Sequence, residues 1–136
     1  MKRAIVIGAT SGIGKEVSRI LAAKGWKVGI AGRRETLLKQ IKESDPESFE
    51  YEVLDVTRED APDRLASLIS KTGGMDLYIH SSGYGMINQD LDPEEQMKTI
   101  KTNITGFVRL VNYAFHHFRA QGSGHIAAIT SVAGTR

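Results

Sequence analysis

The chain alternates short, almost continuous apolar runs with longer stretches in which apolar residues recur every three or four positions. The short runs predict buried strands, and the periodic stretches predict helices with one apolar face. The predicted strands are Arg3–Ile7, Lys27–Ala31, Glu50–Leu54, Leu77–His80 and His125–Thr130. The predicted helices are Gly12–Lys24, Glu35–Glu43, Arg58–Lys71 and Pro93–Gln121.

Boundary residues support several of these elements. Gly25 and Gly122 stand where helix C-caps are expected, and Asp92-Pro93 supplies an N-cap and a first-turn proline to the longest helix. Regular alternation of strands with helices predicts a parallel sheet covered by helices on both faces. The expected fold class is therefore α/β, a doubly wound parallel sheet with strand order 3-2-1-4-5. We expect residues 1–136 to form one domain, because no linker or repeat interrupts them.

Composition narrows the functional classes. The 18 basic and 16 acidic residues are interspersed, so nothing indicates a nucleic-acid partner. The chain has no cysteine, which excludes disulfides and thiolate metal sites, and no segment approaches the length of a membrane span. We therefore expect a cytoplasmic protein with no membrane and no metal role. His80 has no second ligand at metal spacing, and the neighbouring His116 and His117 cannot share one helix face.

The glycine-rich turn after the first predicted strand is the most informative local feature. Glycine tolerates the positive φ angles of a tight turn, and without a Cβ it lets a phosphate approach the backbone. The first N–H groups of the following helix then face that phosphate. The turn predicts a pyrophosphate cradle, the alternative being a simple strand–helix turn. Its residues are Gly8, Thr10, Ser11, Gly12, Ile13 and Gly14, with glycine spacing Gly-x-x-x-Gly-x-Gly.

This turn and four later segments together resemble the short-chain dehydrogenase/reductase family over essentially the whole chain. The later segments, in order, are Leu54-Asp55-Val56-Thr57, His80-Ser81-Ser82-Gly83, Thr102-Asn103-Ile104-Thr105-Gly106 and Ile129-Thr130-Ser131-Val132-Ala133-Gly134. The resemblance implies a Rossmann-like fold that binds NAD or NADP. It also implies hydride transfer between nicotinamide and the carbonyl or secondary alcohol of a small molecule.

The end of the second predicted strand favours NADP over NAD. A carboxylate there would bind the adenosine ribose and repel a 2′-phosphate, but Ala31-Gly32 is followed directly by Arg33 and Arg34. Guanidinium groups suit a phosphate. We expect Arg33 to be the main contact and Arg34 to assist. The alternative is that both arginines are solvated and Glu35 only caps the helix.

The resemblance assigns further roles residue by residue. Asp55 and Val56 would lie beside the adenine, unless Asp55 or Thr57 instead caps the next helix. Ser82 and Gly83 would lie beside the ribose and nicotinamide. The family usually has Asn-Asn-Ala-Gly at this place, so the hydrogen bonds to neighbouring strands of the asparagines replaced by His80 and Ser81 must be made otherwise.

Two candidate catalytic residues also follow from the resemblance. Asn103 would hold a water that leads toward the active-site lysine, and Ser131 would hydrogen-bond the substrate carbonyl. Asparagine, threonine and glycine are poor choices inside a helix, so the segment from Thr102 to Gly106 predicts a local kink with freed backbone groups. The alternative for Asn103 is a solvated side chain.

The family's acid/base pair, Tyr-x-x-x-Lys, does not occur in the 136 residues. We therefore expect a truncated, cofactor-binding part of a longer oxidoreductase that is inactive alone, or one half of a split protein. A non-catalytic dinucleotide sensor or regulatory module is the alternative, and an aggregation-prone relic that binds nothing is a third. The resemblance also implies a homo-oligomer that pairs through the helix at 93–121, together with a further helix.

Overall fold

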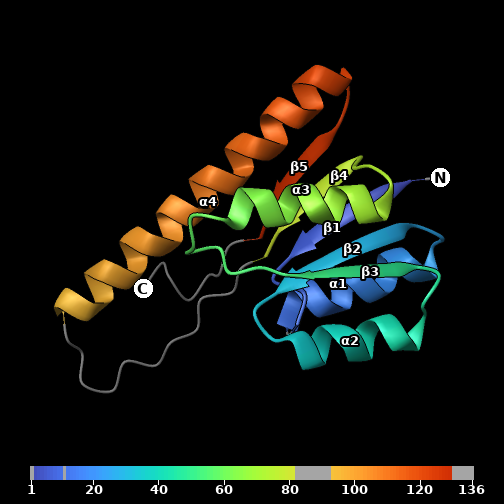
Figure 1. The fold of residues 1–136 in the computed structure, drawn as a ribbon, viewed down its shortest axis with the longest axis horizontal. Helices are drawn as coiled ribbons and strands as arrows, with labels where there is room; N and C mark the ends of the chain where they lie inside the picture. Colours follow the sequence, from blue (N-terminus) through green and yellow to red (C-terminus); the bar gives the residue numbers. More distant parts are fainter. Residues whose placement is uncertain (1, 11, 82–92, 130–136) are drawn as a thin grey trace.

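The computed structural model of the chain describes residues 2–10, 12–81 and 93–129. The described strands are β1 (Arg3–Ile7), β2 (Lys27–Gly32), β3 (Phe49–Val53), β4 (Leu77–His80) and β5 (His125–Ala128). The described helices are α1 (Gly12–Ala23), α2 (Glu35–Ser44), α3 (Ala61–Thr72) and α4 (Pro93–Gln121). The predicted alternation of strands and helices is confirmed, and most boundaries agree within one residue (Figure 1).

All described strands pair in parallel, in the order β3-β2-β1-β4-β5, so the predicted topology is confirmed. The central strand β1 ends at Ile7, which is in register with Ala31 of β2 and His80 of β4. Parallel strands all point the same way, so the loops that follow β1, β2, β3 and β4 emerge at one edge of the sheet. That edge is where the candidate residues of the sequence analysis gather.

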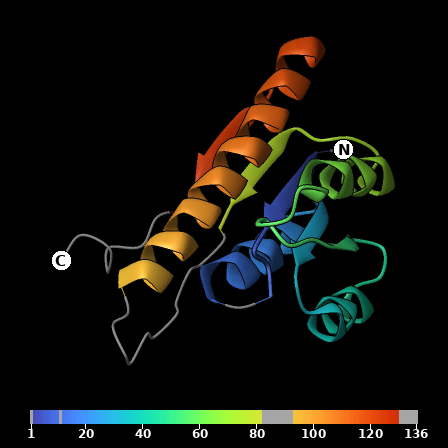
Figure 2. The ribbon, with the colours of Figure 1, turned by 60° about the vertical axis from the view of Figure 1, so that its left-hand side comes forward.

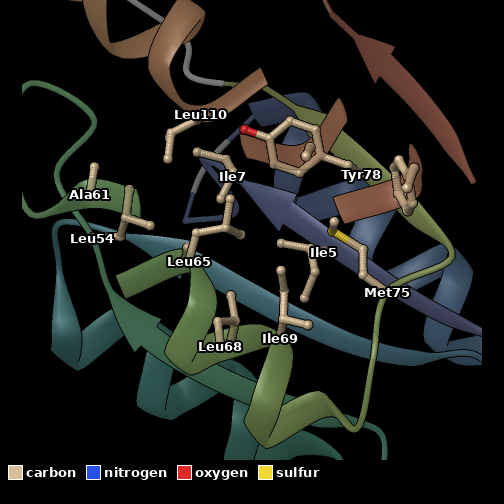
Figure 3. Close-up of a cluster of buried hydrophobic side chains, with 13 residues drawn as sticks. Ile5, Ile7, Leu54, Ala61, Leu65, Leu68, Ile69, Met75, Tyr78 and Leu110 are labelled. Carbon is tan, nitrogen blue, oxygen red and sulfur yellow. The ribbon is translucent and has the colours of Figure 1, made fainter. Parts of the chain in front are cut away.

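The alternation of side chains along β1 creates two cores. Ile5 and Ile7 point toward α3 and α4. They pack with Leu65 and Leu68 of α3 and with Tyr78 of β4 (Figure 3). Val6 points to the other face and packs in a second cluster with residues of β2 and α2, with α1 alongside. The two views of the ribbon show α1 and α2 on one side of the sheet and α3 and α4 on the other (Figures 1 and 2).

The predicted start of the third helix is wrong by three residues. The helix begins at Ala61 rather than Arg58, with Pro62 in its first turn. A start at Arg58 would place Pro62 inside the helix, where it has no N–H to donate. At the other helix ends, Gly25 and Gly122 have φ angles of 91° and 85°, as expected of C-caps. Asp92 lies outside the described residues.

The longest helix, α4, carries apolar side chains on its exposed side. Met97, Ile104, Val108 and Phe115 are each between 51% and 58% exposed. The opposite side of the helix is buried, with Leu110 and Ala114 fully enclosed in the core shared with α3. The helix is therefore apolar on two sides, of which the described residues cover one.

Candidate functional site

The predicted glycine turn follows β1 directly, at the carboxyl-terminal edge of the sheet (Figure 1). Gly8 and Gly12 have φ angles of 84° and 62°, in the left-handed region that favours glycine. Gly14 is buried, and a Cβ there would overlap the carbonyl oxygen of Gly8. A Cβ at Gly12 would meet no atom within 4 Å. The turn is thus tightly closed at Gly14 and open at Gly12.

The turn is fastened to the neighbouring strand. The backbone N–H groups of Gly8 and Ala9 both donate to the carbonyl oxygen of Ala31, at 2.9 and 3.1 Å. The side chain of Thr10 lies against Gly32, where a Cβ would come within 2.7 Å of the threonine methyl carbon. Ile13 is 59% exposed despite being apolar, so it faces outward at the start of α1. Ser11 lies outside the described residues.

Two arginines follow β2 directly in the sequence, next to this turn. Arg33 and Arg34 are both exposed, and neither side chain forms a hydrogen bond or ion pair with another residue in the part of the chain that is described. Arg34 occupies the N-cap of α2 without a side-chain capping bond. Glu35, in the first turn of α2, accepts a bond from the Tyr51 hydroxyl at 3.5 Å. Both guanidinium groups are therefore free to meet an anion.

Asp55 closes a turn immediately after β3. Its Oδ1 accepts bonds from the Thr57 N–H and hydroxyl at 2.9 and 2.7 Å. Partial burial raises the pKa of Asp55, but the bonds from Thr57 and the positive charges of Arg33 and Arg58 outweigh burial, so the pKa lies below its ordinary value. The N-cap of α3 is Asp60, so neither Asp55 nor Thr57 caps that helix. Asp55 is thus an ionised carboxylate near Arg33.

At the end of β4, His80 turns toward α4 and is only 3% exposed. Its Nδ1 is 2.8 Å from the hydroxyl of Tyr78, and its ring meets Phe107 edge-on, with 4.8 Å between centroids. Burial lowers the pKa of His80 to about 4 and raises that of Tyr78, so both groups are neutral at pH 7. The Tyr78 hydroxyl therefore gives the His80 ring a hydrogen-bond partner within β4, and this bond does not link β4 to a neighbouring strand.

The next residue, Ser81, is also buried, and its N–H donates to the Ile7 carbonyl at 2.8 Å. A Cβ at Gly14 would lie 3.2 Å from the Ser81 hydroxyl oxygen, so the glycine turn and the end of β4 are in close contact. Ser82 and Gly83 follow at once but lie outside the described residues, as does Ser131 beyond β5.

The predicted kink in the longest helix is not found as an interruption. α4 is continuous from Pro93 to Gln121, and the hydroxyls of Thr102 and Thr105 donate to the carbonyls of Lys98 and Lys101. These bonds give both threonine hydroxyls a partner within the helix, and bonds of this kind can bend a helix without interrupting it. Asn103 is half-buried on α4, one turn before Phe107.

Gly106 has a different role from the one the sequence suggested. It is buried where α4 crosses the loop after β3, and a Cβ there would overlap the carbonyl oxygen of Val56. From helix propensity alone, a glycine inside a helix is expected to lower the stability of that helix. The contact with Val56 shows that this glycine permits a close approach of two backbones. Tyr78 and Phe107 are residues near the site that were not predicted from the sequence, whereas Gly106 was noted but not its contact with Val56.

The described residues contain no candidate membrane span and no candidate metal cluster. None of the helices in ranges 12–81 and 93–129 is both long and apolar enough to cross a membrane. Within the same part of the chain, no group of three histidine, aspartate or glutamate side chains could hold a metal ion.

Comparison with known proteins gives a consistent picture. The profile of a family described as short chain dehydrogenase matches residues 2–136. An uncharacterised oxidoreductase of Staphylococcus aureus strain MW2 is 33% identical over 137 residues, which cover 98% of this chain and 59% of that protein. The closed form of a serine dehydrogenase complexed with NADP+ is similar in structure, with a TM-score of 0.85 and 27% identity over 98% of this chain and 56% of that one. A 3-ketoacyl-(acyl-carrier-protein) reductase from Brucella melitensis, complexed with NADH, has a TM-score of 0.83 and 24% identity, covering 96% and 57%.

Proposed function

The chain belongs to the short-chain dehydrogenase family, and we propose that it forms the cofactor-binding part of an NADP-dependent oxidoreductase. It spans about three fifths of the length of the curated relative from Staphylococcus aureus. The observation that carries the proposal is that three features lie together at one edge of the sheet. They are the glycine turn, the exposed side chains of Arg33 and Arg34, and the ionised carboxylate of Asp55. The family binds a nicotinamide dinucleotide, which supplies hydride chemistry when bound.

The residues at this edge fit such a cofactor. The closed side of the turn at Gly14 leaves no room for a side chain, while the open side at Gly12 leaves room for a phosphate. In the proposal, Gly8, Thr10, Ser11, Gly12, Ile13 and Gly14 hold the pyrophosphate. Asp55 and Val56 hold the adenine, and Ser82 and Gly83 lie beside the ribose and nicotinamide.

The chemical step is proposed to involve two residues of this chain. Ser131 would donate a hydrogen bond to the substrate oxygen and stabilise charge that develops there. Asn103, half-buried on α4, would support a proton relay through a water. The substrate class would be a small molecule with a carbonyl group or a secondary alcohol. A tyrosine with a lysine four residues later, which the 136 residues do not contain, would complete the relay.

Removing the Arg33 guanidinium tests the preference for NADP. Solved neighbours of this fold hold either NADP+ or NADH, so the preference rests on residues of this chain. We expect Arg33→Ala to weaken NADPH binding about 10- to 100-fold, because a charge-assisted bidentate contact is lost, and to leave NADH binding unchanged. Isothermal titration of the 136-residue chain measures both affinities.

Arg119→Ala is the matched control for Arg33→Ala, since Arg119 is an exposed arginine in the last turn of α4. It removes the same charge from a different part of the molecule and should leave both affinities unchanged. An equal loss of NADPH and NADH binding in Arg33→Ala would contradict a 2′-phosphate contact. The absence of any response to either cofactor in the unaltered chain would contradict the proposed function itself.

Turnover is expected to be absent from the 136-residue chain. A free tyrosine has a pKa near 10, so proton transfer near neutrality needs a cation beside it, and the chain lacks the Tyr-x-x-x-Lys pair. Following the absorbance of NADPH with a panel of ketones and aldehydes should show no oxidation above the rate without protein. Sustained oxidation by the purified chain would show that another residue provides the acid.

Because the 136 residues contain no Tyr-x-x-x-Lys pair, a second candidate function is a dinucleotide sensor or regulatory module without catalysis. A longer form of the protein that contains Tyr-x-x-x-Lys would favour the enzyme. In either case, the exposed apolar side of α4 (Met97, Ile104, Val108 and Phe115) supports pairing with a second copy through this helix.

A further inference from the structure

We propose that Gly106 of α4 is a positioning residue of the cofactor site, because it lets α4 lie against the backbone of Val56 and so fixes the loop at 55–58. That loop carries Asp55 and Val56, the candidate adenine contacts. The inference rests on the proposed function, and it adds a residue that touches neither cofactor nor substrate in that proposal.

The contact at Gly106 is between two backbones. A Cβ on Gly106 would lie 2.8 Å from the carbonyl carbon of Val56 and 3.2 Å from its Cβ, besides overlapping the carbonyl oxygen. A flexible side chain could rotate away from such a group, but the Val56 backbone can only move as part of the loop. Leu110, one turn further along α4, is fully buried in the core. The helix is therefore held on the core side, and displacement falls on the loop.

A second contact joins the same helix to the same loop. The guanidinium of Arg109 donates from Nη1 to the carbonyl oxygen of Arg58 at 3.2 Å. Within the loop, Asp55 accepts the bonds from Thr57 described above. The loop is thus shaped by its own turn on one side and by α4 on the other.

The exposure of the loop explains why this support matters. Thr57 and Arg58 are exposed, and of residues 55–58 only the half-buried Val56 packs against the core cluster, so few core contacts fix the loop. Asp55 is joined to Val56 by a single peptide bond, and a shift of the Val56 carbonyl carries the carboxylate with it. A binding group that moves by a fraction of an ångström loses much of its contribution.

Binding of adenosine 2′,5′-bisphosphate, the adenosine half of NADP, tests the role of Gly106. We expect Gly106→Ala to weaken binding to the 136-residue chain about tenfold in isothermal titration, because the adenine contacts are displaced. Arg109→Leu should weaken binding less, and by the same factor at low and high salt, since its effect comes through the Arg58 carbonyl rather than through charge. Thr105→Ala, on the exposed side of the same turn, should leave the affinity unchanged.

A stability control separates positioning from general destabilisation. Ile69→Val, in the core on α3, should lower the melting temperature while leaving the affinity unchanged. Unchanged affinity in Gly106→Ala would overturn the inference and leave the proposed function standing. If Gly106→Ala does not fold, Arg109→Leu decides, since unchanged affinity there overturns the inference. If the unaltered chain does not bind the bisphosphate, the proposed function and this inference both fail.

Discussion

Replacing Gly14 with alanine should lower the free energy of unfolding by about 3 kcal/mol, a large share of the stability of a small protein. The new Cβ would overlap the Gly8 carbonyl oxygen, and the Ser81 hydroxyl oxygen would lie only 3.2 Å away. These atoms belong to the turn after β1 and to the end of β4, at the centre of the sheet. Urea denaturation followed by circular dichroism measures the change, and a loss below about 1 kcal/mol would contradict a closed turn.

Gly12→Ala should change cofactor binding more than it changes stability. Its Cβ meets no protein atom within 4 Å, so the stability cost should be only about 1 kcal/mol, from the φ of 62°. Gly25→Ala is the matched control, since Gly25 has a φ of 91° and equally open surroundings at the far end of α1. Both variants should lose similar stability, but only Gly12→Ala should weaken NADPH binding. Equal affinities in the two variants would contradict a phosphate at Gly12.

Local patterns in the sequence were enough to predict the sheet and its covering. The buried strands are short apolar runs, and alternation with helices leaves few ways to connect them. Alternation alone allows more than one strand order; the predicted order 3-2-1-4-5 is that of dinucleotide-binding sheets, and it is confirmed. The start of α3 was missed although its cause, Pro62, is local.

The glycine turn was equally accessible from the sequence, because its requirements lie within seven consecutive residues. The role of Gly106 was not accessible from the sequence, because the residue that it contacts, Val56, lies 50 positions away in the chain. Local propensity describes only the cost of a glycine in a helix. The gain appears only when the packing of α4 on the loop after β3 is known.

The surroundings of His80 show the same limit. Alternation along β4 places Tyr78 and His80 on one face, so their proximity follows from the sequence. That Phe107 of α4 would complete the cluster depends on how the helix crosses the sheet. The functional roles of all the candidate site residues remain predictions, and Ser11, Ser82, Gly83 and Ser131 also lie outside the described ranges.

The buried His80 should make the stability of the chain depend strongly on pH. Burial lowers its pKa to about 4 in the folded state, against about 6.5 in an unfolded chain. Between these values the unfolded chain binds a proton that the folded chain does not. The contribution is therefore fully present above pH 6.5 and is lost as the pH falls toward 4. The total loss should be about 3 kcal/mol.

Urea denaturation between pH 7 and pH 5 isolates this histidine from the carboxylates. Glu50 and Asp55 also have lowered pKa values, but their contributions are lost only as the pH falls below their ordinary values near 4. His80→Asn removes the titrating ring and keeps an amide that can bond the Tyr78 hydroxyl, so it should flatten the dependence on pH. His116→Asn, at an exposed position on α4, should leave it unchanged. A slope that survives in His80→Asn would mean that the imidazole is not held neutral between Tyr78 and Phe107.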